Sequence, residues 1–427
     1  GSLISWDECL YAQVAREILI NHNWIDLTWM GLPWSDKPPL YMWVTAVMFK
    51  LFGVNEFSAR FFSAFCGVGT VIVVYLFAAK LYSRRAGIAA AVMFLSTWHV
   101  LWFAKMASLD MAFTFFIALS LLFFKLGEER DQYLFLSVLA VGCAFFTKWI
   151  GASLAPIIIV TYLFITKKLS LLKKPAFLWG VVLVFVVLAW WHGIELLHYG
   201  KGFVKDYFVK HMFVRTTQAL DGHTGNAFTY FEVIPNKGRP WGGFGLLAVL
   251  AAFGSLLFRK DRRHLLPLLW VVAVLLTVSM VQTKLHWYIL GIYPALAIVL
   301  GWAASSLFKK YTVPLVLALA LSSTIYLSID RKVFNLDFIP ETKRLALSVK
   351  RVLPPGEKVV FYGLGDPGMV FYLGDVLISA NDDLFERVVR TSGSFIALEK
   401  NFLANLAAVK YAIVAENNDF VVIKTLQ

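Results

Sequence analysis

The stretch FSARFFSAFCGVGTVIVVYLFAAKLY, residues 57–82, decides the class of fold. Its only charged side chains, Arg60 and Lys80, stand near its two ends, and an apolar helix needs about 20 residues to cross a bilayer. The rest of the chain has the same character: 59% of its 427 residues are hydrophobic and only 16% are charged, against about 25% in a soluble domain. The sequence therefore predicts a polytopic α-helical membrane protein.

Ten such segments are expected to span the membrane. They cover residues 57–82, 86–105, 108–126, 132–148, 151–167, 176–197, 240–258, 264–281, 286–308 and 312–329. Lysine and arginine gather in every second connection, from Arg84 and Arg85 through to Lys309 and Lys310. Because basic residues are enriched in cytoplasmic loops, these connections are expected inside. The basic residues of these connections account for much of the net charge of +13, so the charge does not indicate a nucleic-acid partner.

The opposite face carries few polar side chains, and they are of mixed kinds. They are Asp7, Glu8, Asp36, Lys37, Asp110, Lys148, His211, Arg215, His223 and Lys284. A sparse mixture of acid, base and imidazole on one face is what we expect of an enzyme that faces outward. The three cysteines have no spacing that indicates a metal site or a disulfide framework.

The segment WDECLYAQVARE begins with two adjacent carboxylates, Asp7 and Glu8. Residues 10–19 are expected to form an amphipathic helix, with Gln13 and Glu17 on its polar stripe. The residue types allow two interpretations. The acids either cap the helix and complement its dipole, or they serve a site at the membrane surface.

The segment LPWSDKPPLYMW, residues 32–43, presents Asp36 and Lys37 ahead of two prolines. Pro38 biases Lys37 towards an extended backbone, and a helix is expected to start at the second proline. The pair is either a solvated acid and base in a loop or a lysine presented to a phosphate at headgroup depth.

Further candidates lie at the outer ends of later helices. Asp110 stands in the first turn of an apolar helix, where it either complements the helix dipole or belongs to a functional site. Lys148, and the pair Lys284 and Tyr288, either reach the interface by snorkelling or bind substrate.

The long outer loop at 198–239 holds His211 and Arg215, four residues apart on one helix face. A histidine of this kind is more often a surface residue than a ligand. His223, in a glycine-flanked loop, gives a weaker signal still.

Residues 332–427 are expected to form a small α/β domain outside the membrane, while residues 1–331 form the membrane domain. Strands are predicted at 358–363, 375–380, 395–400 and 410–424, the last as a hairpin turning at Asn417 and Asn418. Residues 340–352 and 401–409 are expected to be helical. The segment GLGDPG, residues 363–368, matches a dinucleotide-binding pattern, but Pro367 is expected to interrupt the helix entry, and no nucleotide cofactor is predicted.

Taken in order, these segments resemble a known family. They are the acid pair at Asp7, the DKPPL motif at 36–40, Asp110, Thr147 with Lys148, the K-H-x-x-x-R segment at 210–215, and K-x-x-x-Y-x-x-x-x-Y-P at 284–294. The chain resembles the C-type glycosyltransferases that use polyprenyl-phosphate sugars, nearest to the lipid A aminoarabinose transferases and related to the protein O-mannosyltransferases. That family has a spanning helix before the acid pair, so an N-terminal truncation is expected.

The resemblance implies roles for individual residues. Asp7, with Glu8 in support, resembles the acid that acts on the acceptor, and Asp110 resembles a second acid. Lys37 and Lys148 resemble lysines that hold the donor phosphate. Arg215, Lys284 and Tyr288 fall on substrate-binding segments, and Asp36 and His211 on positions that approach a divalent metal in some members. Asp36 replaces the more usual Glu, which shortens its reach. Leu10 stands where several relatives carry Arg, so the chain lacks that cation for a lipid A phosphate acceptor.

The implied activity is transfer of a sugar from a polyprenyl-phosphate donor to a lipid, glycan or protein acceptor, with inversion. The expected location is the cell (inner) membrane, with the active site facing the periplasm or exterior. A transporter or flippase of lipid-linked or small solutes is the alternative. Transporters are typically built from repeats with sites at the midplane, and the sequence contains no repeat. A non-catalytic scaffold would have no use for the acids and lysines.

Overall fold

A computed structural model describes residues 1–3, 6–214, 217–218, 224–226, 228–329, 340–362, 366–374, 377–379, 382–406 and 409–426. The chain packs as two units. One comprises Gly1–Trp34, Met42–Ala59 and Asn335–Gln427, and the other Ser35–Tyr41 and Arg60–Phe334. The packing thus groups the N-terminal segment with the C-terminal residues, whereas the sequence assigned it to the membrane domain.

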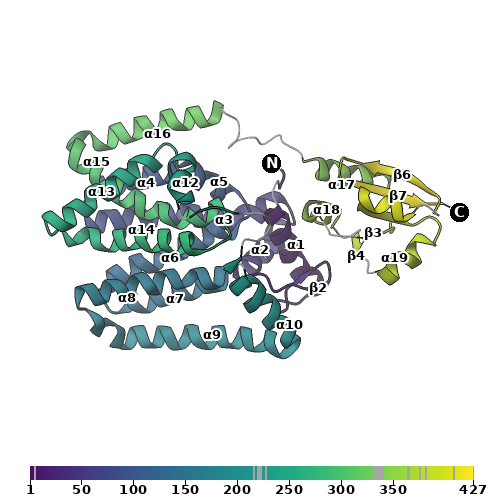
Figure 1. Ribbon diagram of the computed structural model, residues 1–427, viewed down its shortest axis with the longest axis horizontal. Coiled ribbons are helices and arrows are strands. Elements are labelled where there is room, and N and C mark those ends of the chain that lie inside the picture. Colours follow the sequence, from purple (N-terminus) through teal and green to yellow (C-terminus); the bar gives the residue numbers. More distant parts are fainter. Residues whose placement is uncertain are drawn as a thin grey trace. The chain divides into compact units, whose positions relative to one another are not determined.

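The second unit, called the helical unit here, is a bundle of apolar helices (Figure 1). Its main helices are α3 (Glu56–Leu81), α4 (Arg84–Leu95), α5 (Trp98–Lys105), α6 (Leu109–Gly127), α7 (Gln132–Lys148), α8 (Leu154–Thr166), α9 (Pro175–Tyr199), α12 (Thr229–Lys237), α13 (Gly242–Phe258), α14 (Leu265–Met280), α15 (Tyr293–Phe308) and α16 (Thr312–Ile329). Each of the ten predicted segments coincides with helix, which confirms the helical membrane fold.

The number of helices long enough to span is smaller than the ten expected. In the described part of the chain five stretches qualify by length and composition, or seven if each bent pair forms one span. The helices α7 and α8 are apolar but short, and His286–Tyr326 qualifies as one stretch.

The segment predicted as one helix over 86–105 is broken. The helices α4 and α5 meet at a bend of 64°. The hydroxyls of Ser96 and Thr97 donate to the carbonyls of Val92 and Met93, at 2.6 and 2.8 Å. Hydroxyl bonds of this kind bend helices, and the Trp241 indole donates to Ser96 at 2.8 Å. The break therefore depends on a residue far away in the sequence.

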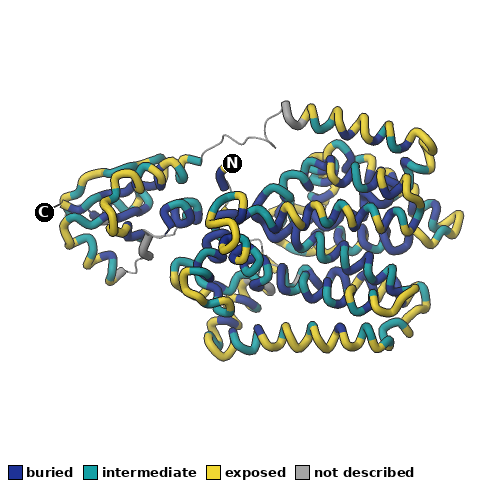
Figure 2. Tube along the Cα trace, turned by 180° about the vertical axis from the view of Figure 1, so that it is seen from behind, coloured by how far each residue is buried: buried dark blue, intermediate teal, exposed yellow. Residues whose placement is uncertain are grey.

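Helix packing leaves apolar surface exposed where lipid would lie. The helix α9 packs along α7, and only 11% of its apolar window is buried (Figures 1 and 2). Its side chains Trp179 and Phe185 are more than two-thirds exposed. Inside the bundle α15 lies directly against α4, because a Cβ at Gly301 would lie 2.5 Å from the Ala86 carbonyl oxygen. An apolar exterior around a packed interior fits a multi-pass membrane protein.

The connections predicted to be cytoplasmic gather at one end of the helical unit. Glu129 accepts from Lys80 at 2.7 Å, Glu128 from Lys168 at 2.8 Å, and the carboxylate of Asp131 lies 3.0 Å from Lys174. These ion pairs join three basic connections, at 80–84, 125–131 and 167–174. We call this the basic end of the helical unit.

The other unit contains an N-terminal helix, a small hairpin and the C-terminal domain. The helix α1 (Trp6–Asn21) is followed by β1 (Thr28–Trp29) and β2 (Leu32–Pro33), and the helix α2 (Leu40–Phe52) lies mostly in this unit. The expected polar stripe of α1 is wrong: Gln13 and Glu17 are buried. The hairpin covers them, because Glu17 accepts from the Thr28 hydroxyl at 2.6 Å and from the Met30 amide at 2.8 Å.

The C-terminal domain is a five-stranded sheet with helices on both faces. Its elements are α17 (Glu341–Val352), β3 (Val359–Tyr362), α18 (Pro367–Leu373), β4 (Leu377–Ser379), α19 (Asp382–Val389), β5 (Phe395–Glu399), β6 (Tyr411–Glu416) and β7 (Phe420–Thr425). The strand order is β4-β3-β5-β7-β6, with β3 parallel to β4 and β5, and with β7 antiparallel to β5 and β6. The predicted α/β domain and its terminal hairpin are confirmed.

The helix predicted over 401–409 is confirmed for its described part, because residues 400–406 form a 3-10 helix. The sequence missed α18 and α19. Pro367 does not interrupt a helix but begins α18, where the Asp366 carboxylate caps the Met369 amide at 2.8 Å. Proline suits the first helical position because its missing N–H would have no partner there. Residues 363–365 of the GLGDPG segment lie outside the described residues.

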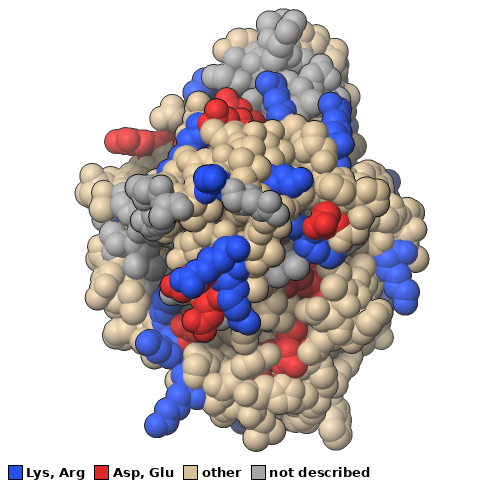
Figure 3. Space-filling view, turned by 90° about the vertical axis from the view of Figure 1, so that its right-hand side faces the viewer, with Lys and Arg blue, Asp and Glu red and all other residues tan. Residues whose placement is uncertain are grey.

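On the face shown in Figure 3, Lys and Arg side chains lie beside Asp and Glu side chains rather than in one basic field. This arrangement gives no support to a nucleic-acid surface there.

Candidate active site

An ion pair joins two of the predicted site residues. The ammonium of Lys148, the last residue of α7, lies 2.5 Å from the carboxylate of Asp110, the second residue of α6. The Lys148 side chain is 22% exposed and that of Asp110 only 7%. The acid therefore sits behind the lysine and holds it at the surface of the helical unit.

A chain of hydroxyls fixes Asp110. Ser108 caps α6 and also donates to the Asp110 carboxylate at 3.0 Å. Ser63 donates to the Ser108 carbonyl at 2.8 Å, and its hydroxyl lies 2.8 Å from that of Tyr41. Because these side chains come from three separate helices and are buried, the carboxylate has little freedom to turn.

An aromatic ring covers Lys148. Its ammonium lies 4.7 Å from the centre of the Tyr288 ring and 5.9 Å from that of Phe113. A cation over an aromatic face is stabilised by the ring quadrupole. An ammonium has three N–H donors, of which Asp110 takes one. The arrangement can therefore present a fixed positive charge to an anionic oxygen, as a phosphate-binding site requires.

Two histidines that the sequence did not indicate form a buried chain with Tyr293, the second tyrosine of the motif at 284–294. The Tyr293 hydroxyl lies 3.0 Å from Nδ1 of His99, whose Nε2 lies 3.0 Å from Nδ1 of His286. The buried phenol proton needs an acceptor, so Tyr293 donates to His99. His99 then carries its proton on Nε2 and donates to His286, which in turn carries its proton on Nε2. Polar side chains inside apolar helices were the available signal.

The predicted substrate ligand Lys284 caps a helix in this structure. Its ammonium donates to the carbonyls of Val278, Ser279 and Val281, at 3.0, 2.6 and 2.6 Å. These are all three donors of the ammonium, and they satisfy the C-terminal carbonyls of α14. Burial lowers the pKa of Lys284. A role in substrate binding stays a prediction, and it would require one of these bonds to break.

The DKPPL motif lies at the start of α2. Pro38 and Pro39 are buried, while Asp36 and Lys37 are half-buried. The Lys37 ammonium donates to the carbonyl of Asp36 at 3.1 Å. The prolines therefore anchor the motif and leave both charged side chains at the surface of the helical unit.

The opening acids belong to the other unit. Asp7 and Glu8 occupy the first turn of α1, where Asp7 is half-buried and Glu8 is buried. This position agrees with helix-dipole complementarity, and it leaves Asp7 accessible. The catalytic role of both residues stays a prediction.

Several candidates lie outside the described residues. Arg215 and His223 are among them, and so is the side chain of His211, although its backbone belongs to the π-helix Val204–Val214. Among the residues that the structure describes, no group of three or more His, Cys, Asp or Glu side chains could hold a metal ion.

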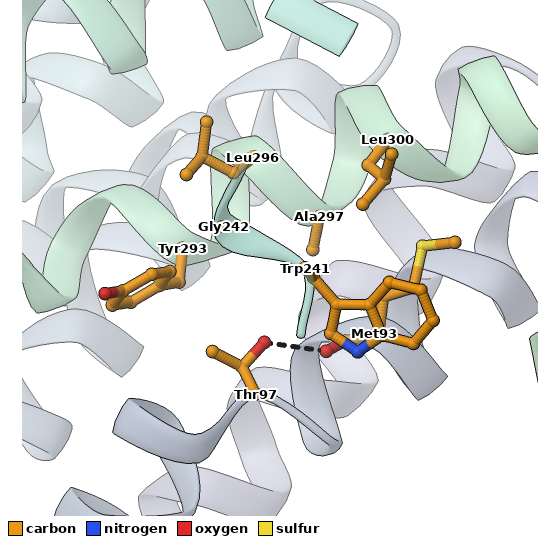
Figure 4. Close-up of a pocket in the computed structure, with 8 residues that line it drawn as sticks. All are labelled: Met93, Thr97, Trp241, Gly242, Tyr293, Leu296, Ala297 and Leu300. Atoms are coloured by element: carbon orange, nitrogen blue, oxygen red, sulfur yellow. Dashed lines mark hydrogen bonds between the residues drawn. The ribbon is translucent and has the colours of Figure 1, made fainter. Parts of the chain in front are cut away.

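A small pocket lies next to the histidine chain rather than at Lys148. Met93, Thr97, Trp241 and Tyr293 line it together with aliphatic side chains of α15, and Thr97 donates to the Met93 carbonyl at 2.8 Å (Figure 4). No charged side chain lines the pocket. The ion pair of Asp110 and Lys148 therefore lies outside this pocket.

Comparison with known proteins bears on this arrangement. The family described as dolichyl-phosphate-mannose-protein mannosyltransferase matches residues 36–192, a range that contains Lys37, Asp110 and Lys148. A crystal structure of ArnT from Cupriavidus metallidurans bound to undecaprenyl phosphate superposes with a TM-score of 0.82, over 99% of this chain and 94% of that chain, at 19% identity. The chain is thus similar to members of the C-type glycosyltransferase superfamily and shares their fold.

The curated relatives that the chain matches are longer than the chain itself. The undecaprenyl phosphate-alpha-4-amino-4-deoxy-L-arabinose arabinosyl transferase 2 of Pseudomonas fluorescens (strain Pf0-1) is 30% identical over 313 residues, which are 70% of this chain and 55% of the relative. An uncharacterised Aquifex aeolicus protein is 29% identical over 297 residues, covering 69% of this chain and 58% of the relative. The chain thus matches little more than half the length of these two relatives.

A more distant C-type structure has the same fold. The oligosaccharyltransferase of Archaeoglobus fulgidus in its apo form superposes with a TM-score of 0.64 at 12% identity, over 94% of this chain and 66% of that chain. The resemblance stated from the sequence motifs is confirmed at the level of the superfamily.

Proposed function

We propose that the protein is an integral-membrane glycosyltransferase that moves a sugar from a polyprenyl-phosphate donor to a lipid, glycan or protein acceptor. The observation that carries the proposal is Lys148, held by buried Asp110 and covered by Tyr288, in a fold that it shares with an undecaprenyl-phosphate-bound ArnT. We place the site in the cell (inner) membrane, facing the periplasm or exterior, because the basic end of the helical unit is expected in the cytoplasm.

The proposed reaction is a single displacement. An acceptor oxygen forms a bond to the anomeric carbon while the bond from that carbon to the phosphate oxygen breaks, so the configuration inverts. The polyprenyl phosphate leaves with the electron pair, and Lys148 and Lys37 stabilise its charge. Asp7, supported by Glu8, takes the proton of the acceptor hydroxyl. Arg215, Lys284 and Tyr288 are proposed to bind the donor.

A divalent metal, held by Asp36 and His211, remains part of the proposal as the resemblance implies it. Of the two proposed metal ligands, only Asp36 has a side chain that the structure describes. The described residues therefore provide only part of the set of ligands. A metal there would add positive charge near the donor phosphate. No step of the proposed displacement depends on it.

The test is a transfer assay on purified protein in detergent, with radiolabelled polyprenyl-phosphate sugars and a membrane extract as the source of acceptors. We expect label to move into a lipid or protein fraction with wild-type protein and not with Asp7→Asn. The variant Lys173→Gln, which changes a lysine of the basic end, should keep the activity. Full transfer by folded Asp7→Asn would contradict the role of this acid. Absence of transfer from every donor would favour the transporter, which a flux assay would then test.

A further inference from the structure

A groove runs between α13 and α15 close to the basic end of the helical unit. Gly254, Ala303 and Ser306 are among the small residues that line it, and Phe258 and Leu307 stand along it with exposed fractions of 88% and 74%. Its cavity volume is about 390 Å³, within the range of small-molecule sites. Because its apolar side chains face outward in a membrane protein, the groove faces lipid.

The groove results from side-chain size. Near the start of α13 the two helices pack closely, since a Cβ at Gly245 would lie 3.3 Å from Leu296. At Gly254 a Cβ would meet nothing within 4 Å. The space beside Gly254 is therefore open, and a larger side chain there would fill the groove without a clash.

Basic residues follow both helices at the end of the groove. Arg259 lines it, Lys260 and Arg262 follow in the same connection, and Lys309 and Lys310 follow α15. The nearby acid, Asp261, is paired with Arg263 at 2.7 Å. Among the described residues, no ion pair involves any of these five cations. The end of the groove thus has an unbalanced positive charge.

We propose that this groove binds an anionic glycerophospholipid, with one acyl chain along Gly254 and the phosphate headgroup against Arg259, Lys309 and Lys310. Basic pockets between membrane helices on the cytoplasmic side are suited to such headgroups. The site is independent of the proposed transfer reaction, because it lies at the end of α15 away from Tyr293. A second copy of the chain would also fit a surface of small residues, but the two basic rims would then repel each other.

The test is native mass spectrometry of the full protein in detergent, with phosphatidylglycerol or phosphatidylcholine of the same acyl chains. We expect one phosphatidylglycerol to be retained in preference to phosphatidylcholine. Gly254→Leu should abolish this preference while leaving the unfolding temperature unchanged or raised, since glycine is a poor helix former. The triple variant Arg259→Gln/Lys309→Gln/Lys310→Gln should weaken retention by roughly fivefold for each cation removed.

A matched control removes the same charge elsewhere on the basic end. The triple variant Arg130→Gln/Lys167→Gln/Lys173→Gln should retain phosphatidylglycerol as wild type does. Equal loss in both triple variants would overturn the site in favour of a general charge effect. Undiminished retention by Gly254→Leu would also overturn it, and a dimer that Gly254→Leu converts to monomer would assign the groove to a second copy.

Discussion

At the scale of single residues, the sequence predicted Asp110 and Lys148 separately but not their ion pair. The two positions are 38 residues apart, and only the packing of α6 on α7 joins them. Ser63, Ser108 and the two histidines of the buried chain were missed for the same reason: each gains its role from a partner in another helix. Lys284 illustrates the reverse, because its position was predicted but its three helix-capping bonds were not.

The ion pair makes a prediction about stability. Lys148→Gln leaves a buried carboxylate without its cation, and loss of one partner of a buried pair costs about 3–5 kcal/mol. Lys148 is partly exposed, so we expect the lower end of that range, and the unfolding temperature in detergent should fall. The double variant Asp110→Asn/Lys148→Gln leaves no unpaired charge and should recover most of the loss. Additive losses in the double variant would show that the two side chains do not interact.

The histidine chain makes a second prediction. His286→Ala removes the acceptor for the buried Nε2–H of His99, at a cost of about 1–3 kcal/mol. His286→Asn keeps an acceptor at the position of Nδ1 and should cost less. Thermal unfolding of the two variants measures the difference. If Asn and Ala destabilise equally, the hydrogen bond between His99 and His286 makes no net contribution to stability.

At the scale of elements, each of the ten segments that hydropathy predicted coincides with helix, because burial in lipid imposes the pattern directly on the sequence. Hydropathy did not predict α12, which lies in the expected outer loop. It did not predict the break between α4 and α5, which depends on side-chain bonds at Ser96 and Thr97 and on the distant Trp241. Periodicity also gave the wrong exposed face for α1. The residues expected on its polar stripe are buried, because the hairpin donates hydrogen bonds to Glu17 inside the protein.

Glu17 is therefore expected to hold the hairpin formed by β1 and β2. Glu17→Ala removes the acceptor of the Met30 and Gly31 amides, at 2.8 and 3.1 Å. Hydrogen exchange at these two amides should become faster, while exchange in the C-terminal sheet stays unchanged. Glu386→Ala, which changes an exposed acid, serves as the control and should leave the hairpin amides as they are. Unchanged exchange in Glu17→Ala would mean that the hairpin is held by other contacts.

At the scale of the whole molecule, the multi-pass membrane fold and the C-terminal α/β domain were both predicted from composition and periodicity. The packing of the N-terminal segment with the C-terminal residues was not, because composition separates the chain by hydropathy and carries no information on contacts between distant segments. The superfamily followed from the order and sidedness of short motifs, none of which is specific alone. The fold adds information that the motifs do not contain, because it shows that buried Asp110 holds Lys148 in place.

The role of Lys148 in sugar transfer is tested most directly with the double variant Asp110→Asn/Lys148→Gln. Its transfer activity is measured in protein whose unfolding temperature is close to that of wild type. We expect this folded variant to lose transfer from the polyprenyl-phosphate donor, because the cation that stabilises the leaving phosphate is gone. Lys173→Gln, assayed beside it, should transfer at the wild-type rate. Undiminished transfer by the double variant would contradict the proposed role of Lys148, since the site would then take no part in the reaction.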